Sequence, residues 1–365
     1  MSTDIDKLTW RTRWVMRRNA LLGSARFQRW ASRTPFIRGI ARRRAAAQFD
    51  LVAGFVYSQI LVAMVESGLI EYLTGRLHSF DDVVAFLGFE PDAADRLLRA
   101  ARALELVESP QAGLWTLGEQ GAALSPNSGA MAMIRHHRLL YQDLADPLAL
   151  LGSGRREETM LSAFWSYASR QKASGGHQTY SALMAATQPM VAQQIIDSYD
   201  FSRHRKMLDI GGGTGAFVSA VSSVAPRLAF GIFDLPEVLK GADASMATLH
   251  PGSFRDMDIP TGYDLITLTR IVHDHDDDVV QALLVKIRKA LPPNGRLLII
   301  EPMAGAVSAE RMGDGYFGLY LWAMGSGRPR TAFELRSMLQ SAGFSGARQV
   351  KTDLPVIADA IVATS

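Results

Sequence analysis

Residues 207–224 constrain the fold more than any other stretch of this sequence. Met207-Leu208-Asp209-Ile210 is a short apolar run, Gly-Gly-Gly-Thr-Gly-Ala follows it, and an apolar helical pattern continues from Phe217 to Val224. A strand, a glycine turn and a helix in that order are typical of nucleotide-type sites in α/β sheets. Glycine lets the backbone turn sharply and lets a ligand approach the helix N-terminus closely.

The hydrophobic pattern divides the chain into four parts. Beyond Lys206, short apolar runs at 207–210, 228–233, 264–269 and 296–300 alternate with helical stretches such as Val279 to Ala290, which predicts a parallel α/β sheet. We therefore expect a basic arm (1–45), a winged-helix-like module (46–126), a helical region rich in Met and aromatic residues (127–203) and an α/β domain (204–365).

The winged-helix-like module is predicted from local signals. Ser79-Phe80-Asp81-Asp82 is a helix-capping pattern, Pro91 is suited to a helix start, and Leu114 to Leu117 indicates a short hairpin. A scaffold or dimer platform is one interpretation of such a module, and a DNA-binding module is the other.

The net charge of the chain conceals an asymmetry. Residues 1–44 carry twelve Lys/Arg and two Asp, a net charge of +10, so the remaining chain carries −7 of the total of +3. Tryptophan and phenylalanine side chains are interleaved with these cations, at Trp10, Trp14, Phe27, Trp30 and Phe36. Such an arm is suited to peripheral association with an anionic membrane surface, or to packing on a partner subunit; contact with nucleic acid is a third reading, but no nucleic-acid partner is expected.

The chain has no cysteine, which excludes disulfides, thiolate metal ligands and cysteine nucleophiles and fits a reducing, cytoplasmic setting. No signal peptide is evident. The longest apolar stretch, Leu51 to Val65, contains Ser58 and Gln59 and is shorter than the roughly 18 residues of a spanning helix, so we expect a buried helix there.

The glycine loop alone leaves NAD and S-adenosylmethionine open as ligands. Residues 211–216 satisfy the dinucleotide pattern, and Asp234 ends the next apolar run, where an acid can bind a ribose diol. Three features favour S-adenosylmethionine: Asp209 directly before the loop, the acidic segment Phe254 to Met257, and the histidine-acid cluster that begins at His273.

That cluster, Ile-Val-His-Asp-His-Asp-Asp-Asp at 271–278, has three interpretations: a metal site, an acid-base centre or a charged helix start. Asp276, Asp277 and Asp278 precede a helical pattern, where exposed N–H groups and the helix dipole favour acids. The pattern delivers His273 to the carboxyl end of the fourth strand, where α/β sheets bind ligands. We therefore expect His273 to be a general base, and we expect no metal.

Several motifs together resemble the small-molecule O-methyltransferases of the caffeate and hydroxyindole type. They are Asp-Ile-Gly-Gly-Gly-Thr-Gly at 209–215, Phe-Asp-Leu-Pro-Glu-Val-Leu at 233–239, Arg-Asp-Met at 255–257, His-Asp at 273–274, Leu-Pro-Pro-Asn-Gly at 291–295 and Glu-Pro-Met at 301–303. The resemblance covers roughly residues 50–350. It implies a Rossmann-like class I methyltransferase sheet, an N-terminal dimerisation domain and a homodimer.

The resemblance also implies roles for individual residues. His273 would be the base, with Glu301 beside it as its orienter. The cofactor-binding candidates are Asp209, Gly211, Gly213, Gly215, Asp234, Leu235, Asp256, Met257 and Arg270. Two departures stand out: Arg-Pro-Arg-Thr at 328–331 replaces a second glutamate near the base, and His275 replaces the usual tryptophan.

The expected substrate is a small apolar molecule. Met184, Tyr316, Tyr320 and Met324 are candidates for its pocket, because large apolar residues are dense near the expected site. Within the family, the His-Asp-His variant and Gly-Leu-Tyr-Leu-Trp-Ala-Met at 318–324 are most similar to bacterial carotenoid O-methyltransferases, whose membrane-dissolved substrate would suit the basic arm. Another pigment or aromatic polyketide as substrate, a dehydrogenase, and a DNA-binding regulator are the alternatives.

Overall fold

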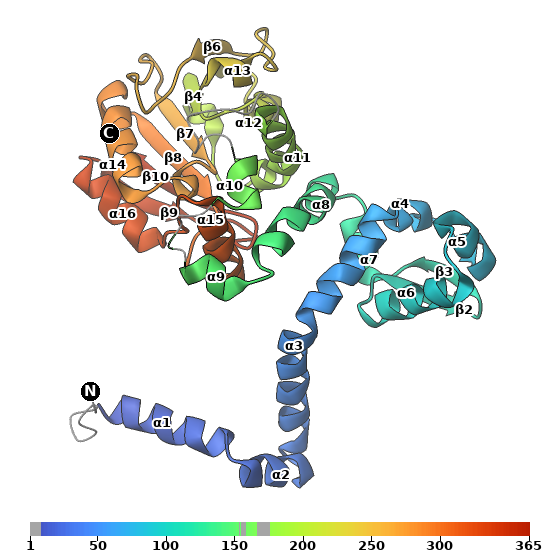
Figure 1. The fold of residues 1–365 in the computed structure, drawn as a ribbon. Coiled ribbons are helices and arrows are strands. Elements are labelled where there is room, and N and C mark those ends of the chain that lie inside the picture. Colours follow the sequence, from blue (N-terminus) through green and yellow to red (C-terminus); the bar gives the residue numbers. More distant parts are fainter. Residues whose placement is uncertain (1–8, 153, 155–157, 166–175) are drawn as a thin grey trace. The chain divides into compact units, whose positions relative to one another are not determined.

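The computed structural model describes residues 9–152, 154, 158–165 and 176–365, without the side chains of 176–182 (Figure 1). Residues 1–8 of the predicted basic arm lie outside this range. The chain forms two compact units, Met1–Gly121 and Ala122–Ser365.

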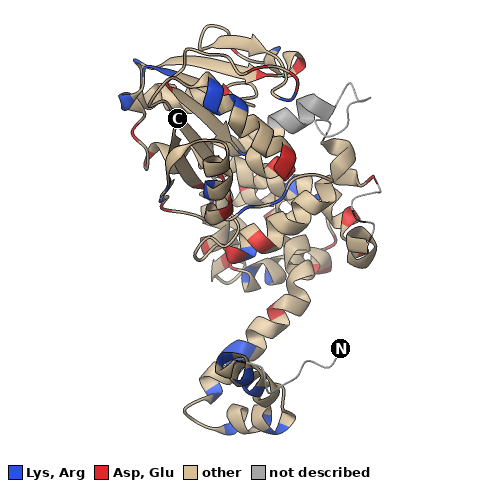
Figure 2. Cartoon of the chain, turned by 90° about the vertical axis from the view of Figure 1, so that its left-hand side faces the viewer, with Lys and Arg blue, Asp and Glu red and all other residues tan. Residues whose placement is uncertain are grey.

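The first unit begins with three basic helices. Helices α1 and α2 start at hydroxyl side chains, because Thr9 accepts from the backbone N–H of Thr12 and Ser24 accepts from that of Phe27. Figure 2 shows the Lys and Arg residues gathered on this segment. Apolar side chains are exposed between them, including Trp10, Trp14, Trp30 and Phe36. The helices are α1 (Trp10–Leu22), α2 (Ala25–Arg33) and α3 (Arg38–Glu66).

Helix α3 differs from the buried helix that the sequence predicts. Only Val62, Met64 and Val65 are buried, whereas Leu51 is 79% exposed and Phe55 is 72% exposed. The expectation failed because an apolar run does not reveal whether another element of the same chain covers it. At 29 residues, α3 is also the one described helix that is long and apolar enough to cross a membrane, by length and composition only.

The rest of the first unit has the winged-helix arrangement. The capping pattern forms as predicted, because Ser79 and Asp82 satisfy each other's backbone N–H groups, and Pro91 is the first residue of its helix. The short strands pair antiparallel in the order β1-β3-β2. The elements are α4 (Leu69–Leu73), β1 (His78–Ser79), α5 (Phe80–Leu87), α6 (Pro91–Ala103), β2 (Val107–Gln111) and β3 (Leu114–Leu117), and α7 (Glu119–Leu124) runs from this unit into the second.

The second unit starts with helices that pack closely on one another. Gly129 on α8 lies against the backbone of α11, where an added Cβ would lie 2.6 Å from the carbonyl oxygen of Ala186. This close approach requires glycine. The helices are α8 (Ser128–Asp143), α9 (Pro147–Gly152), α10 (Met160–Phe164) and α11 (Gly176–Ile196), followed by the turn η2 (Phe201–Arg203).

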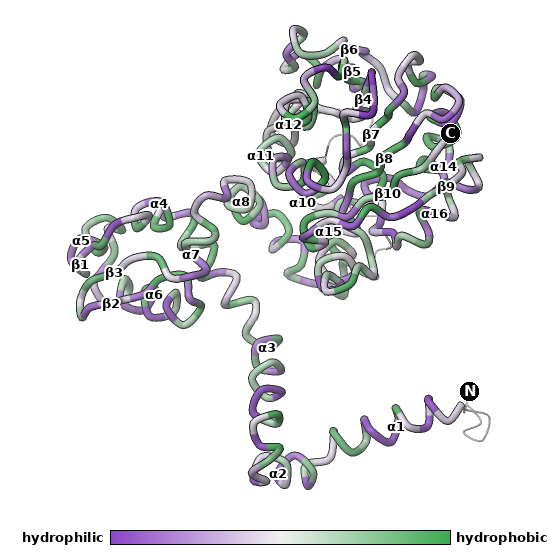
Figure 3. Tube along the Cα trace, turned by 180° about the vertical axis from the view of Figure 1, so that it is seen from behind, coloured by the Kyte–Doolittle hydropathy of each residue, from purple (hydrophilic) through white to green (hydrophobic). Residues whose placement is uncertain are grey.

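A seven-stranded sheet of order β6-β5-β4-β7-β8-β10-β9 forms the centre of the second unit. The first five strands in this order are parallel, and β10 and β9 pair antiparallel. Figure 3 shows hydrophobic residues along its central strands. The strands are β4 (Lys206–Ile210), β5 (Ala229–Asp234), β6 (Thr248–Pro251), β7 (Leu265–Thr269), β8 (Arg296–Glu301), β9 (Ser345–Val350) and β10 (Asp359–Thr364).

Helices cover both faces of this sheet, so its central strands are apolar on both sides. One face packs Ile266 and Leu268 of β7 against helices α14 and α16. The other face packs Leu265 of β7 against α11 and α12. The covering helices are α12 (Ala216–Val224), α14 (Asp277–Ala290) and α16 (Ala332–Ser341), with α13 (Pro236–Leu239) beside β6.

Two segments that the sequence placed at strand ends are turns. Strand β7 ends at Thr269, because Arg270 has a φ of 56° and leads into the 3-10 turn η3 (Val272–Asp274), which carries His273. Strand β6 ends at Pro251, so residues 254–257 form a turn closed by the N–H of Met257 donating to Ser253 at 2.9 Å. Both turns place side chains just beyond the carboxyl edge of the sheet.

Candidate active site

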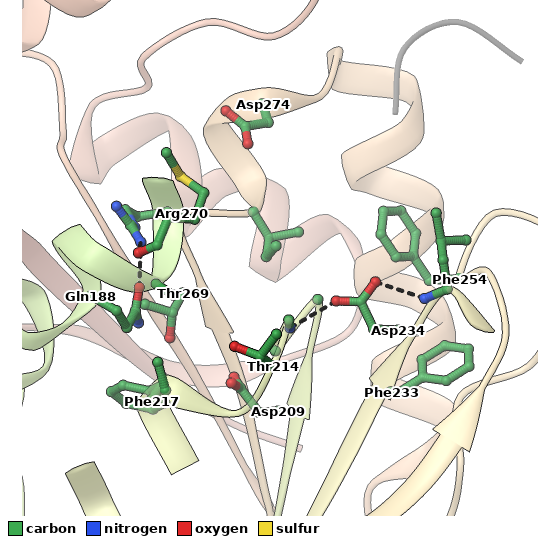
Figure 4. Close-up of a pocket in the computed structure, with 18 of the residues that line it drawn as sticks. Gln188, Asp209, Thr214, Phe217, Phe233, Asp234, Phe254, Thr269, Arg270 and Asp274 are labelled. Atoms are coloured by element: carbon green, nitrogen blue, oxygen red, sulfur yellow. Dashed lines mark hydrogen bonds between the residues drawn. The ribbon is translucent and has the colours of Figure 1, made fainter. Parts of the chain in front are cut away.

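A pocket opens beyond the carboxyl ends of the parallel strands (Figure 4). This is where open α/β sheets bind ligands. Of the predicted site residues, Asp209, Gly211, Gly213, Asp234, Leu235, Arg270 and Met184 line it. Residues that the sequence analysis did not single out also line it, including Trp165, Gln188, Thr214, Phe217, Ser253 and Thr269.

The glycine loop after β4 adopts a backbone that other residues would strain. Gly211, Gly213 and Gly215 have φ values of 68°, 59° and 90°. A Cβ on Gly211 would also lie 2.3 Å from the side chain of Ile271. Gly215 is the N-cap of α12 and does not line the pocket. Gly211 and Gly213 therefore bring backbone and not side chains to the pocket before α12, which suits the close approach of a polar ligand tail.

Asp234 connects the glycine loop to the end of β5. Its Oδ2 accepts the N–H of Gly213 at 2.8 Å, and its Oδ1 accepts the N–H of Leu235 at 2.6 Å. Figure 4 shows this carboxylate directed toward the loop. A carboxylate oxygen has more than one lone pair, so Asp234 keeps the capacity to accept the two hydroxyls of a ribose.

Asp209 is buried beneath the loop at 1% exposure. The pKa of Asp209 is raised to about 7: burial is the main cause, the hydroxyl of Thr267, which donates to Oδ1 at 2.6 Å, opposes the rise, and the charge of Asp234 adds to it. Asp209 and Asp234 thus both line the pocket near the glycine loop, and their negative charges would repel each other when both are ionised. A cationic ligand would relieve this repulsion.

Arg270 connects the loop after β7 to helix α11. Its guanidinium donates to Thr187 Oγ1 at 2.6 Å, to the carbonyl of Met184 at 2.9 Å, and to Gln188 Oε1 (Figure 4). The left-handed backbone of Arg270 is strained for a residue with a Cβ, so these bonds hold an unfavourable conformation. The predicted cofactor residue Arg270 therefore shapes the pocket wall together with Met184.

His273 is 5% exposed and lies behind the pocket, because its neighbours Asp274 and His275 are the lining residues. The imidazole Nε2 lies 3.1 Å from Asp274 Oδ1. Glu301 was expected to orient the ring, but its Oε2 accepts the backbone N–H of His273 at 2.9 Å. The carboxylate thus fixes the turn that carries the base. Sequence could not distinguish this contact from one with the ring.

The charges around His273 set its protonation. Burial acts to lower its pKa, but the carboxylates of Asp274 and Glu301 outweigh burial, so the pKa of His273 is raised above its ordinary value. Burial raises the pKa of Glu301, and His273 and Arg330 oppose that rise. Within the described residues, His273 Nδ1 and Glu301 Oε1 are buried without a hydrogen-bond partner.

Arg330 supports the turn from below. It is fully buried and donates to the carbonyls of Val272 at 2.7 Å and His275 at 2.8 Å, which flank the base. It also donates to Asp277 Oδ1 at 2.6 Å. Asp277 lies in the first turn of α14, as expected of a helix-start acid, and it is also an ion-pair partner of Arg330. At the Arg-Pro-Arg-Thr departure, a buried cation thus contacts the backbone carbonyls of the turn that carries His273.

The predicted adenine residues lie at the edge of the site. Asp256 and Met257 are exposed and do not line the pocket, whereas Phe254 and Arg255 of the same turn do. Met257 packs on Gly252, where an added Cβ would lie 2.6 Å from its sulfur.

The predicted substrate residues gather on another wall. Tyr316 lies on η4 (Arg311–Phe317), a π-helix, and Tyr320 and Met324 lie on α15 (Gly318–Met324). None of the three lines the pocket. Their hydroxyl partners are His137 Nε2, 2.7 Å from Tyr316, and His136 Nε2, 2.8 Å from Tyr320.

Phe317, at the end of η4, connects this wall to the base. Its ring stacks on that of His273, with centroids 5.7 Å apart and an interplanar angle of 26°. π-helical turns are rare and often occur at functional sites. Among the described residues, no group of three His, Asp or Glu side chains is arranged to hold a metal.

A parallel sheet with a glycine loop after β4, an acid after β5 and a histidine-acid turn after β7 is the arrangement of a class I methyltransferase. A family model for the O-methyltransferase domain matches residues 141–345, and a model for the O-methyltransferase dimerisation domain matches residues 49–127. The chain therefore belongs to the O-methyltransferase family, as the sequence motifs predicted. The dimerisation-domain match supports the predicted homodimer.

Relatives and solved structures agree with this assignment. The chain is 42% identical to demethylspheroidene O-methyltransferase of Rhodobacter capsulatus, over 93% of this chain and 87% of the relative. It is 38% identical to demethylspheroidene O-methyltransferase of Cereibacter sphaeroides, over 94% and 93%. Human N-acetylserotonin methyltransferase, solved in complex with SAM, shares the fold with a TM-score of 0.74 at 23% identity, covering 88% of this chain and 97% of that one.

The two arginines of the departure segment provide a matched test of the buried network. We expect Arg330→Met to lower the free energy of unfolding by about 3 kcal/mol, because it leaves buried carbonyls without their donor. Arg328 also pairs with Asp277, but its side chain is 39% exposed, so Arg328→Met should cost at most about 1 kcal/mol. Urea unfolding measures both changes, and equal costs would contradict the analysis.

Asp209 predicts a pH dependence of stability. Its folded pKa of about 7 lies above the value of about 3.9 for an unfolded aspartate, so the folded state keeps the proton longer. The stability of the wild type relative to Asp209→Asn should therefore fall as pH rises from about 4 to about 7 and then level off. Urea unfolding across this range measures the difference, and a difference independent of pH would refute the assignment.

Proposed function

We propose that the protein transfers the methyl group of S-adenosylmethionine to a hydroxyl of a hydroxylated carotenoid. The observation that carries this proposal is the similarity to two demethylspheroidene O-methyltransferases, at 42% and 38% identity over nearly the whole chain. Solved structures of the same fold include one in complex with SAM and one in its SAH-bound form.

The residues of the pocket fit this cofactor. The glycine loop leaves room where a Cβ would strain the backbone, and Asp209 and Asp234 supply negative charge for a ligand that carries a sulfonium and an ammonium group. Asp234 is suited to the ribose, and Leu235 and the 252–255 segment continue the pocket toward the expected position of the adenine. S-adenosylmethionine supplies an electrophilic methyl group on sulfur when it is bound.

His273 provides the proton acceptor. The carboxylate of Asp274 accepts from Nε2 at 3.1 Å, so Nε2 carries the ring proton of the neutral imidazole and Nδ1, which has no partner among the described residues, keeps the lone pair. As the methyl group moves from sulfur to the hydroxyl oxygen, the hydroxyl proton would move to Nδ1, and Asp274 would stabilise the resulting imidazolium. An aliphatic alcohol has a pKa near that of water, about 15.7, so proton transfer must accompany methyl transfer and positioning must supply much of the rate.

An apolar substrate fits the wall beside the base. Tyr316, Tyr320 and Met324 form a cluster with Trp165, and the hydroxyls of both tyrosines are paired with histidines. Burial raises the pKa of Tyr316 and Tyr320, so both stay neutral. The cluster is therefore aromatic and uncharged, and Trp165 connects it to the pocket, which suits a hydrocarbon.

We further propose that the arm binds the surface of an anionic membrane. Helices α1 and α2 lie outside the matched dimerisation domain, which begins at residue 49, and expose tryptophans between arginines. This combination suits an interfacial helix pair, and a membrane-dissolved substrate would then be close to the enzyme. The exposed apolar residues of α3 near Phe55 fall within the dimerisation match, which favours a second subunit as their cover.

The proposed reaction predicts a specific product. Purified protein incubated with methyl-labelled S-adenosylmethionine and a detergent extract of hydroxylated carotenoids should label a carotenoid ether. His273→Ala should lower the rate at least about 100-fold while binding the cofactor normally, because general-base catalysis contributes about that much. If the label appears in added phenols but in no carotenoid, the protein is still a methyltransferase, but the proposed carotenoid substrate is wrong.

The arm predicts binding to vesicles. Wild type should sediment with phosphatidylglycerol-containing vesicles at low salt, and each arginine near an anionic surface contributes about 1 kcal/mol. A triple variant with Gln at Arg42, Arg43 and Arg44 should therefore bind about 100-fold more weakly. The matched control is a triple Gln variant of the exposed α6 residues Arg96, Arg99 and Arg102. Equal loss in both variants would contradict the role of the arm.

A further inference from the structure

The turn after β6 is held by a lysine from a distant helix. Lys286 on α14 donates to three carbonyls of that turn: Phe254 at 2.8 Å, Arg255 at 3.0 Å and Met257 at 2.9 Å. An ammonium group has three N–H donors, so all the donors of Lys286 bond to the turn at residues 254–257. Phe254 and Arg255 line the pocket, and Lys286 therefore fixes part of its wall without touching the ligand.

The same turn is tied to the histidine-acid segment. Arg255 Nη2 lies 3.2 Å from His275 Nδ1. Burial lowers the pKa of His275 to about 4, Asp274 opposes the fall, and Arg255, His273 and Arg330 add to it. The ring is therefore neutral near pH 7. Because arginine only donates, Nδ1 is the acceptor and the ring proton is on Nε2.

Contacts to its ring and its backbone hold His275 in place. Its carbonyl accepts from the buried Arg330 at 2.8 Å. Its ring lies near Trp165, with centroids 5.9 Å apart, and meets Phe254 edge-on at 5.2 Å. His275 lines the pocket, and among the described residues its ring bonds through Nδ1 and not through Nε2. The Nε2–H group is therefore available to a ligand in the pocket.

The order of the strands indicates that the adenine of the cofactor lies at the end of the pocket beside residues 252–255. The pocket follows β4, β5 and β6, from the glycine loop past Asp234 to the 252–255 segment. In Figure 4, Phe254 lies beside Asp234, on the side away from Arg270 and Gln188. With the ribose on Asp234 and the amino acid tail at the glycine loop, the adenine lies toward Phe254, Arg255 and His275.

We propose that His275 donates its Nε2–H to a ring nitrogen of the adenine, and that Lys286 and Arg255 are positioning residues that hold the turn and the imidazole for this contact. The inference rests on S-adenosylmethionine being the cofactor. It gives a role to the histidine that stands where the family resemblance implies tryptophan, and to a lysine that no cofactor motif contains.

A calorimetric titration with S-adenosylhomocysteine tests the positioning role. Lys286→Met should weaken binding about tenfold and raise the KM for S-adenosylmethionine, with little change in kcat at saturation or in the KM for the acceptor. Lys289→Met, an exposed lysine on the same helix, is the matched control and should bind within twofold of wild type. A loss in kcat without a change in affinity would overturn the positioning role.

The 1-deaza, 3-deaza and 7-deaza analogues of S-adenosylhomocysteine test the contact itself. Wild type should bind one of the three about tenfold more weakly than S-adenosylhomocysteine, and His275→Phe should lose that discrimination. Equal binding of all three analogues by wild type would overturn the inference, whatever the variant does. If wild type binds no S-adenosylhomocysteine, the proposed function fails as well, so the two failures are distinguishable.

Discussion

The active end of the sheet depends on one buried cation, the guanidinium of Arg330. The 3-10 turn that carries His273 lies beyond β7, where no strand ladder satisfies its carbonyls. Arg330 donates to the carbonyls of Val272 and His275, which lie on either side of His273 in the chain, and Glu301 accepts the backbone N–H of His273. Burying such charges is costly unless they are paired and hydrogen-bonded. Arg330 meets that condition through Asp277 and the two carbonyls, and it fixes the turn that carries His273 as a consequence.

At the glycine-loop end of the pocket, in contrast, two acidic side chains lie near each other. Asp209 and Asp234 are both buried, and burial is the main cause of the raised pKa of Asp209, to which the charge of Asp234 adds. A ligand with positive charge on sulfur and nitrogen would lower the cost of ionisation. The pocket therefore prefers a cation before any specific contact forms. In the proposed site, the methyl donor would lie near the two acids and His273 would accept the proton from the hydroxyl.

The sequence predicted what depends on local pattern. The parallel strands, the glycine loop, the capping box at Ser79 and the helix after Asp276 all follow from residues close together in the chain. Contacts between distant residues were not predictable. Arg330 and Lys286 have no local signature, because their roles come from carbonyls 55 or more and 29 or more residues away. The turn between β7 and His273 was not predicted, because Arg270 adopts a left-handed conformation that its type does not favour.

The most direct test of this account is the pH dependence of kcat/KM for the acceptor in wild type and Asp274→Asn. A general base must be neutral, so kcat/KM should rise with pH through the pKa of His273, which the carboxylates hold above its ordinary value of 6.5. Removal of one carboxylate charge should move the midpoint of the rise to lower pH. A flat profile in wild type, or a midpoint that the substitution leaves in place, would contradict the assignment of His273 as the base held by this network.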